Sequence, residues 1–174
     1  PMPEAAPPES VPSNLELFQQ YAKSGHPAFE FFLRIDQPIE RHHLDHVDLL
    51  KPEPSEGPHR TWLRAGGPLG DDPVVHQALL TYASDYGLIE SAINRHGHSF
   101  LTEELMLASL DHAVWFHQPF RFDQWHLYVK HSPVASGGRG LIFGRIYAQD
   151  GTLVASVAQE GLMRRRTPAS ERGQ

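Results

Sequence analysis

Three polar side chains interrupt stretches of this sequence that are otherwise apolar. Asp85 falls at the border of the apolar face of a predicted helix, and Ser109 and Gln159 share strand faces with apolar residues. A carboxylate in such a position is costly unless it has a partner, and a buried amide needs hydrogen-bond partners. Polar groups held at this cost are candidates for acid–base chemistry or for positioning a ligand. The alternatives stay open, since Asp85 could be solvated or paired with a basic residue, and Gln159 could tie down a loop.

Two segments that combine histidine with aspartate invite other chemistry. Imidazoles and a carboxylate crowd together in residues 42–46, HHLDH, but strand alternation would send neighbours to opposite faces, so no metal site is expected. The same alternation predicts structural hydrogen bonds, rather than an acid–base pair, for Asp111 and His112. The absence of cysteine excludes a thiol nucleophile and a thiolate metal site. The sequence has neither a nucleophile elbow nor a phosphate-binding loop, and we expect no cofactor.

A helix over residues 72–95 is expected to carry Asp85. Asp71 and Asp72 ahead of Pro73 are typical of a helix start. The apolar residues that follow keep the helical period as one stripe, namely Val75, Leu79, Tyr82, Tyr86, Ile89 and Ile93. The spacing therefore predicts a single long helix that buries this stripe.

The rest of the chain has mainly the pattern of strands. We expect them at residues 29–35, 38–41, 61–65, 105–117, 126–132, 139–148 and 152–164, with a hairpin at Asp150 and Gly151. One long helix among five to six largely antiparallel strands predicts an α+β fold in which a curved sheet wraps the helix. Both faces of residues 105–117 are largely apolar, so a neighbouring domain or a second copy should cover part of the sheet.

The N-terminal segment, residues 1–27, is expected to precede the folded domain. Residues 1–12 are rich in proline, glutamate and alanine, which predicts a linker or a disordered arm. Ser13 and Glu16 form a capping box ahead of a short helix that should end near Gly25. The domain itself is expected to span residues 28–166, and residues 167–174 to form a flexible tail.

Composition narrows the class of protein. The 174 residues suit one domain, and a hydrophobic fraction of 40% with a mean hydropathy of -0.42 is typical of a soluble globular protein. The net charge of -6 argues against general affinity for nucleic acid or an anionic membrane. No apolar run is long enough to span a bilayer and no signal peptide opens the chain, so we expect a cytoplasmic protein.

Several motifs in the same order resemble those of the acyl-CoA thioesterase II family, whose TesB-like members are built from two hotdog domains in one chain. The resemblance covers about residues 28–165, and residues 1–27 resemble the family's interdomain linker. The matching residues are Ser84, Asp85, Tyr86, Ser109, Leu110, Asp111, His112, Trp115, Phe116, His117, Pro119, Phe120, Trp125, Leu127, Tyr128, Arg139, Gly140, Leu141, Asp150, Gly151, Gln159, Glu160 and Gly161.

The resemblance implies a hotdog fold and hydrolysis of acyl-CoA thioesters. The family's catalytic Asp, Ser or Thr, and Gln fall on Asp85, Ser109 and Gln159, which would activate one water molecule in a dry pocket between helix and sheet. Direct attack of this water on the thioester would need no covalent acyl-enzyme. Substrate-binding roles are expected for Trp115, Phe116, Arg139 and Gly140.

The resemblance matches only the second, C-terminal hotdog domain of such a chain. Either this chain is a fragment that stays with an N-terminal hotdog half, or it self-associates, most simply as a homo-oligomer. Two other functions stay open. One is a non-catalytic hotdog domain that binds acyl-CoA or serves as an assembly half, and the other is a hydratase or dehydratase, which the same fold supports by analogy.

Overall fold

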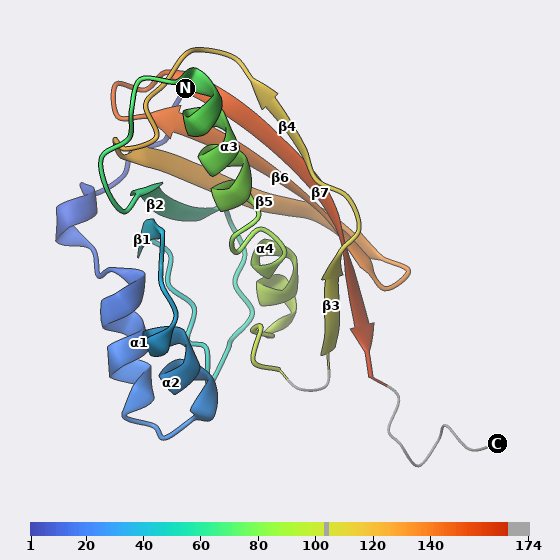
Figure 1. The fold of residues 1–174 in the computed structure, drawn as a ribbon. Helices are drawn as coiled ribbons and strands as arrows, with labels where there is room; N and C mark the ends of the chain where they lie inside the picture. Colours follow the sequence, from blue (N-terminus) through green and yellow to red (C-terminus); the bar gives the residue numbers. More distant parts are fainter. Residues whose placement is uncertain (103–104, 167–174) are drawn as a thin grey trace.

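The computed structural model describes residues 1–102 and 105–166, so the tail expected at residues 167–174 lies outside the described part. Seven strands form one antiparallel sheet in the order β1-β2-β5-β6-β7-β3, and β4 also pairs with β7 (Figure 1). The strands are β1 Ile39–His43, β2 His59–Ala65, β3 Leu105–Ser109, β4 Ala113–Phe116, β5 His126–Ser136, β6 Arg139–Ala148 and β7 Leu153–Arg165. The expected α+β fold with a curved antiparallel sheet is confirmed.

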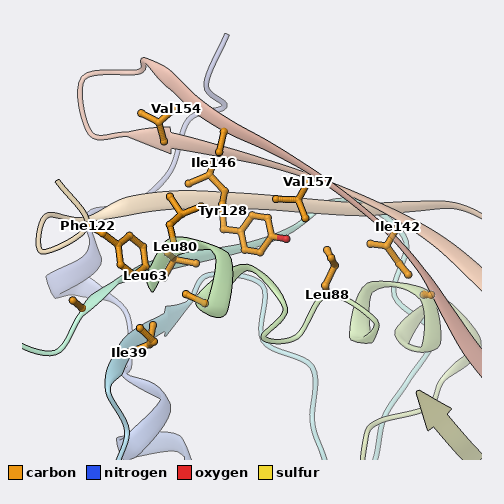
Figure 2. Packing of buried hydrophobic residues seen from close by; sticks show 14 residues of the cluster. Ile39, Leu63, Leu80, Leu88, Phe122, Tyr128, Ile142, Ile146, Val154 and Val157 are labelled. Carbon is orange, nitrogen blue, oxygen red and sulfur yellow. The ribbon is translucent and has the colours of Figure 1, made fainter. Parts of the chain in front are cut away.

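The sheet wraps α3, which spans Pro73–Ser84 (Figure 1). Leu80 of this helix is fully buried, and it packs with Tyr128 of β5 and Ile146 of β6. Figure 2 shows the core side chains gathered between α3 and the face of the sheet that we call the inner face. Tyr128 also donates a hydrogen bond from its hydroxyl to the carbonyl oxygen of Ser84, at 2.9 Å. The last turn of α3 is therefore fixed to the middle of the sheet.

The predicted single helix over residues 72–95 is wrong in its extent. The chain leaves α3 after Ser84, Gly87 takes a left-handed φ of +65°, and a short helix, α4, resumes at Glu90–Ile93 before the 3-10 turn η2, Asn94–His96. The buried face of α3 also differs from the predicted stripe, because Tyr82 is 52% exposed while Leu80 is buried. A left-handed residue ends an α-helix, and glycine adopts this conformation without steric cost.

The aromatic segment predicted as a strand at residues 29–35 forms a helix, α2, which spans Pro27–Arg34. Pro27 occupies its first turn, and the side chain of His26 accepts a hydrogen bond from the backbone N–H of Ala28 at 3.3 Å. Phe29 is fully buried whereas Phe31 is 60% exposed. The α2 helix packs beside α1, Asn14–Ala22, whose predicted capping box between Ser13 and Glu16 is confirmed.

The first twelve residues pack on the outer face of the sheet, opposite α3, and include the 3-10 turn η1, Pro8–Ser10. Trp62 donates a hydrogen bond from Nε1 to the carbonyl oxygen of Ala6 at 2.8 Å. Met2, Ala5 and Val11 contact a buried cluster of Trp62, Trp125, Leu127, Val129 and Tyr147. The expectation of a disordered arm is therefore wrong, since the outer face of the sheet supplies the apolar surface that the arm lacks by itself.

In the described part of the chain, no helix is both long enough and apolar enough to cross a membrane.

Candidate active site

Asp85 occupies the position that caps the C-terminus of α3, with φ −77° and ψ −23°. Its position is fixed by the preceding residue, because Ser84 is fully buried and accepts the hydrogen bond from Tyr128. The C-terminal end of a helix carries a partial negative charge, so a carboxylate there gains nothing from the helix dipole. The stability of the helix therefore does not explain this residue.

A bulge between β3 and β4 brings Ser109 and His112 to the same place. Ser109 pairs with Gly161 of β7, and Ala113 pairs with Ala158. The segment from Ser109 to Ala113 therefore contains one residue more than the segment of β7 opposite it. Asp111 holds the bulge, because its Oδ1 accepts a hydrogen bond from the backbone N–H of Glu160 at 2.7 Å. A bulge re-aims the side chains on either side of it. The continuous strand predicted over residues 105–117 is thus interrupted at the candidate site.

Gln159 lies on the inner face of β7, opposite Ile142 of β6, and is only 1% exposed. Its Nε2 donates to Oγ of Ser109, and Oγ of Ser109 donates to Oδ1 of Asp85 at 3.3 Å. The three polar residues singled out in the sequence therefore form one continuous chain of hydrogen bonds from the buried sheet to the end of α3. None of them is a solvated residue without a partner.

His112 fixes the orientation of the Gln159 amide. Its Nδ1 lies 2.9 Å from Oε1 of Gln159, and an amide oxygen only accepts, so Nδ1 carries the hydrogen. Nε2 of the same ring lies 2.8 Å from Oγ of Ser84, whose single hydrogen serves either Nε2 or the carbonyl oxygen of Thr81, also at 2.8 Å. Because Oε1 is held by His112, the NH₂ group of Gln159 must face Ser109.

The outcome for Asp111 and His112 is divided. The structural hydrogen bond predicted for Asp111 is present. The contact between His112 and Gln159 was not predicted from the sequence. Strand alternation only indicated that Asp111 and His112 point to opposite faces. The bulge is the cause, and no residue in the segment marks it by pattern alone.

The dry pocket expected around Asp85 is wrong for this chain taken alone. The Asp85 side chain is 56% exposed, whereas His112 is 19% exposed and Gln159 is buried. Oδ1 of Asp85 also lies 3.9 Å from Nδ1 of His112. The network therefore opens to solvent at its carboxylate end, where a water molecule or a ligand can reach it.

The four residues expected to bind substrate lie outside this network. Trp115 is 54% exposed on β4, and Phe116 stacks on Phe120 with ring centroids 6.1 Å apart. Nη1 of Arg139 pairs with Oε2 of Glu160 at 3.4 Å. A Cβ at Gly140 would lie 2.8 Å from Cβ of Ala92, so glycine at this position lets α4 approach the sheet closely.

The HHLDH segment makes bonds within the protein. Oε1 of Glu40 and two backbone carbonyl oxygens surround His42, and His46 lies 2.7 Å from the hydroxyl of Tyr21. Asp45 accepts two side-chain hydrogen bonds from Arg60, each of 2.8 Å. Within residues 1–102 and 105–166, no three His, Cys, Asp or Glu side chains come together as a metal site.

Comparison with known proteins identifies relatives of one kind. The sequence model of the family described as acyl-CoA thioesterase matches residues 37–162. The chain is 34% identical over 177 residues to acyl-coenzyme A thioesterase 8 of Homo sapiens, an alignment that covers 98% of this chain and 55% of that protein. The chain thus spans about half the length of the curated relatives it matches.

Solved structures agree with this result. An acyl-CoA thioesterase II, TesB2, from Mycobacterium marinum superposes with a TM-score of 0.67 at 38% identity, over 95% of this chain and 56% of that one. A protein of unknown function with a hotdog fold from Alicyclobacillus acidocaldarius superposes with a TM-score of 0.66 at 19% identity, over 95% of this chain and 55% of the other. The second likeness concerns the fold alone, and the expected hotdog fold is confirmed.

Proposed function

Since the chain belongs to the acyl-CoA thioesterase family, we propose that it hydrolyses acyl-CoA thioesters to a free acid and CoA. The observation that carries this proposal is the continuous hydrogen-bond chain through Asp85, Ser109 and Gln159. These groups come from a helix end and two strands, and they meet where the carboxylate is open to solvent. A base beside two groups that hold water is the arrangement that hydrolysis by water needs.

In the proposed mechanism Asp85 takes a proton from a water molecule as the water oxygen attacks the thioester carbonyl carbon. Ser109 and the NH₂ group of Gln159 hold this water, a positioning effect that can supply several kcal/mol of the barrier. The tetrahedral intermediate collapses by breaking the carbon–sulfur bond, and the CoA thiolate recovers a proton. Ser109 is not the proposed nucleophile, because His112 contacts Gln159 and Ser84 rather than Ser109.

A single-turnover reaction in heavy-oxygen water tests both the activity and the mechanism. With the 174-residue chain in excess over octanoyl-CoA, free CoA should appear, and the octanoate formed in that turnover should carry one heavy oxygen atom. Direct attack of water puts solvent oxygen into the product. Attack by the Asp85 carboxylate would instead release CoA and form a mixed anhydride. Water that opens this anhydride at the aspartyl carbon would leave the first octanoate unlabelled and put the label into Asp85. No CoA release would contradict the activity, and unlabelled octanoate would contradict the mechanism.

Replacing His112 tests its role as a positioning residue. In His112→Asn the side-chain NH₂ can replace Nδ1–H as the donor to Gln159, whereas in His112→Gln the NH₂ lies one carbon farther out, at the place of Nε2. We expect kcat to fall by about tenfold or more in His112→Gln, with partial recovery in His112→Asn, because the NH₂ group of Gln159 loses its fixed orientation. KM should change little in either variant. Equal losses in both, or a loss confined to KM, would contradict this role.

We also propose that a second hotdog domain, either an N-terminal half or another copy of this chain, covers the β3–β4 side of the sheet. Large apolar side chains are exposed there, namely Met106, Leu110, Trp115 and Phe116. Surfaces of this kind mark interaction sites in soluble proteins. The mass of the particle in solution should exceed that of the 19.6 kDa chain, and a monomer at all concentrations would contradict self-association. The cytoplasmic location stays a prediction.

A further inference from the structure

A cavity of about 230 Å³ lies on the β1–β2 side of the sheet, away from Ser109 and Gln159. Residues of α1, α2, β1, β2, β5 and α4 line it, together with the segments before and after β1 and the loop that follows Asp85. Figure 1 shows α1, α2, β1 and α4 in this part of the molecule. Asp85, Ser109 and Gln159 are not among its lining residues. The cavity is larger than the roughly 150 Å³ cavity that holds a benzene molecule in an engineered protein, so it has room for a small organic ligand.

Two cationic side chains line this cavity. Lys130 of β5 is only 3% exposed, and Arg41 of β1 stacks over the ring of Tyr86 with its Cζ 4.5 Å from the centroid. In the described part of the chain, neither cation forms an ion pair within 4.0 Å. Glu90 is the carboxylate that most favours the charged form of Lys130, and Asp45 is paired with Arg60. Asp36 also lines the cavity, but it is exposed at the surface. Among the lining residues that are not exposed and not already paired, two cations therefore face one carboxylate, and the extra positive charge is costly to bury without an anion.

Three further polar atoms at this cavity are buried and have no hydrogen-bond partner among the described residues. They are Nε of Arg41, Nε2 of His59 and Oγ of Ser91. His59 is 7% exposed and Ser91 is 1% exposed. Most buried polar groups in proteins are satisfied, and each exception calls for an explanation. All three atoms belong to residues that line the cavity, and a bound anion that draws these side chains toward it would be such an explanation.

One part of the lining, beside α1 and α2, is apolar. Phe18 of α1 stacks on Phe32 of α2 with ring centroids 5.0 Å apart, and Phe100 meets Phe32 edge-on at 5.7 Å. Leu17, Ile35 and Leu49 complete this part of the wall. The cavity thus combines a cationic part with an aromatic and aliphatic part. Small-molecule sites likewise combine an apolar wall with polar groups that orient the ligand.

We propose that this cavity is a binding site for a monocarboxylate with a short apolar tail, with the carboxylate at Arg41 and Lys130 and the tail among Phe18, Phe32 and Phe100. A single negative charge matches the excess left by two cations and Glu90, whereas an inorganic phosphate offers nothing to the apolar wall. The site is separate from the Asp85 network and does not depend on the proposed hydrolysis. Its ligand has the chemistry of a fatty acid, so it can respond to the acid that a thioesterase releases.

The charge of Lys130 links binding to pH. Burial lowers the pKa of Lys130 to about 8, so the side chain is mostly cationic at neutral pH and loses its charge as the pH rises through that value. The ionisable groups around Lys130 are Glu90 on α4, Arg41 and His43 on β1, Asp45 in the loop after β1, His59 on β2 and Tyr128 on β5. Burial lowers the pKa of His43 and of His59, so neither ring adds charge at neutral pH. Carboxylate binding should therefore weaken between about pH 7 and about pH 9.5.

Calorimetric titration of the whole chain with octanoate tests the proposal. We expect saturable binding of one octanoate per chain, and binding at least about tenfold weaker for octanol, which has the same tail without the charge. Lys130→Met should weaken octanoate binding by about tenfold or more while the thermal midpoint stays equal or rises, because the variant removes a buried charge. Ser91→Ala, a smaller change, should weaken binding by a few-fold. Lys23→Met, on the exposed end of α1, is the matched control and should bind as the parent chain does.

Each arm has a result that overturns the proposal. Equal affinity for octanol, or unchanged octanoate binding in a folded Lys130→Met, would show that the cations do not hold the ligand. Binding of inorganic phosphate with the same dependence on Lys130, without octanoate binding, would replace the proposed ligand class. Loss of octanoate binding in Asp85→Asn would place the ligand at the Asp85 network instead. Failure of thioester hydrolysis would leave the octanoate result standing, so the two proposals fail separately.

Discussion

Replacing Asp85 by Asn should lower kcat for acyl-CoA hydrolysis by about 10²–10⁴-fold, the usual contribution of a general base, with little change in KM. The amide keeps the size of the carboxylate, and its oxygen can still accept the 3.3 Å hydrogen bond from Ser109. It cannot take up the proton that the attacking water must lose. The loss should therefore appear in the chemical step, measured as single-turnover release of CoA.

The matched control is Asp150→Asn. Asp150 makes a similar hydrogen bond, since its Oδ1 accepts from the backbone N–H of Thr152 at 2.9 Å, but it lies in the turn between β6 and β7. We expect its kcat to stay within about twofold of the parent, because this side chain only supports a turn. Parental activity in Asp85→Asn would remove Asp85 as the base. Equal losses in both variants would point to a general effect of replacing carboxylates.

The substitution Gly144→Ala should cost about 2–4 kcal/mol of unfolding free energy. A Cβ at this position would lie 2.8 Å from the Tyr128 hydroxyl and would overlap its ring. Tyr128 is fully buried, and its hydroxyl donates to the carbonyl oxygen of Ser84. The ring cannot move without straining the core or breaking this bond. Urea unfolding with equal slopes for parent and variant would give the difference directly.

Gly67→Ala separates overpacking from the general effect of removing a glycine. A Cβ at Gly67 would meet no heavy atom within 4 Å, and the backbone there is outside the left-handed region. Its stability should stay within about 0.5 kcal/mol of the parent or rise slightly, because alanine restricts the unfolded chain. A Gly144→Ala variant as stable as Gly67→Ala would show that Tyr128 is not held rigidly. The activity of Gly144→Ala should fall only if the end of α3 moves with Tyr128, because the Tyr128 hydroxyl is bonded to Ser84.

Local signals in the sequence were reliable where a few neighbouring residues decide the structure. The capping box of Ser13 and Glu16, the turn at Asp150 and Gly151, and the long strands that became β5, β6 and β7 are all present. Local signals failed where two structures suit the same residues. A short aromatic run is compatible with a strand or a helix, and Pro27 with His26 favoured the helix. The disordered arm was also predicted from residues whose apolar partners lie far along the chain.

The amino-acid sequence alone determined which chemistry is available, because Asp85, Ser109 and Gln159 are polar residues in apolar surroundings. The tertiary structure decided how they meet. A bulge of one residue turns His112 toward Gln159, and Gly87 stops the helix so that Asp85 caps it rather than lying within it. Likewise, only folding gathers Arg41, His59 and Lys130 around one cavity. A hydrogen bond requires about 3 Å, whereas a slip of one residue sends a side chain to the opposite face. Local sequence patterns do not predict side-chain positions this accurately, because the packing of distant segments determines those positions.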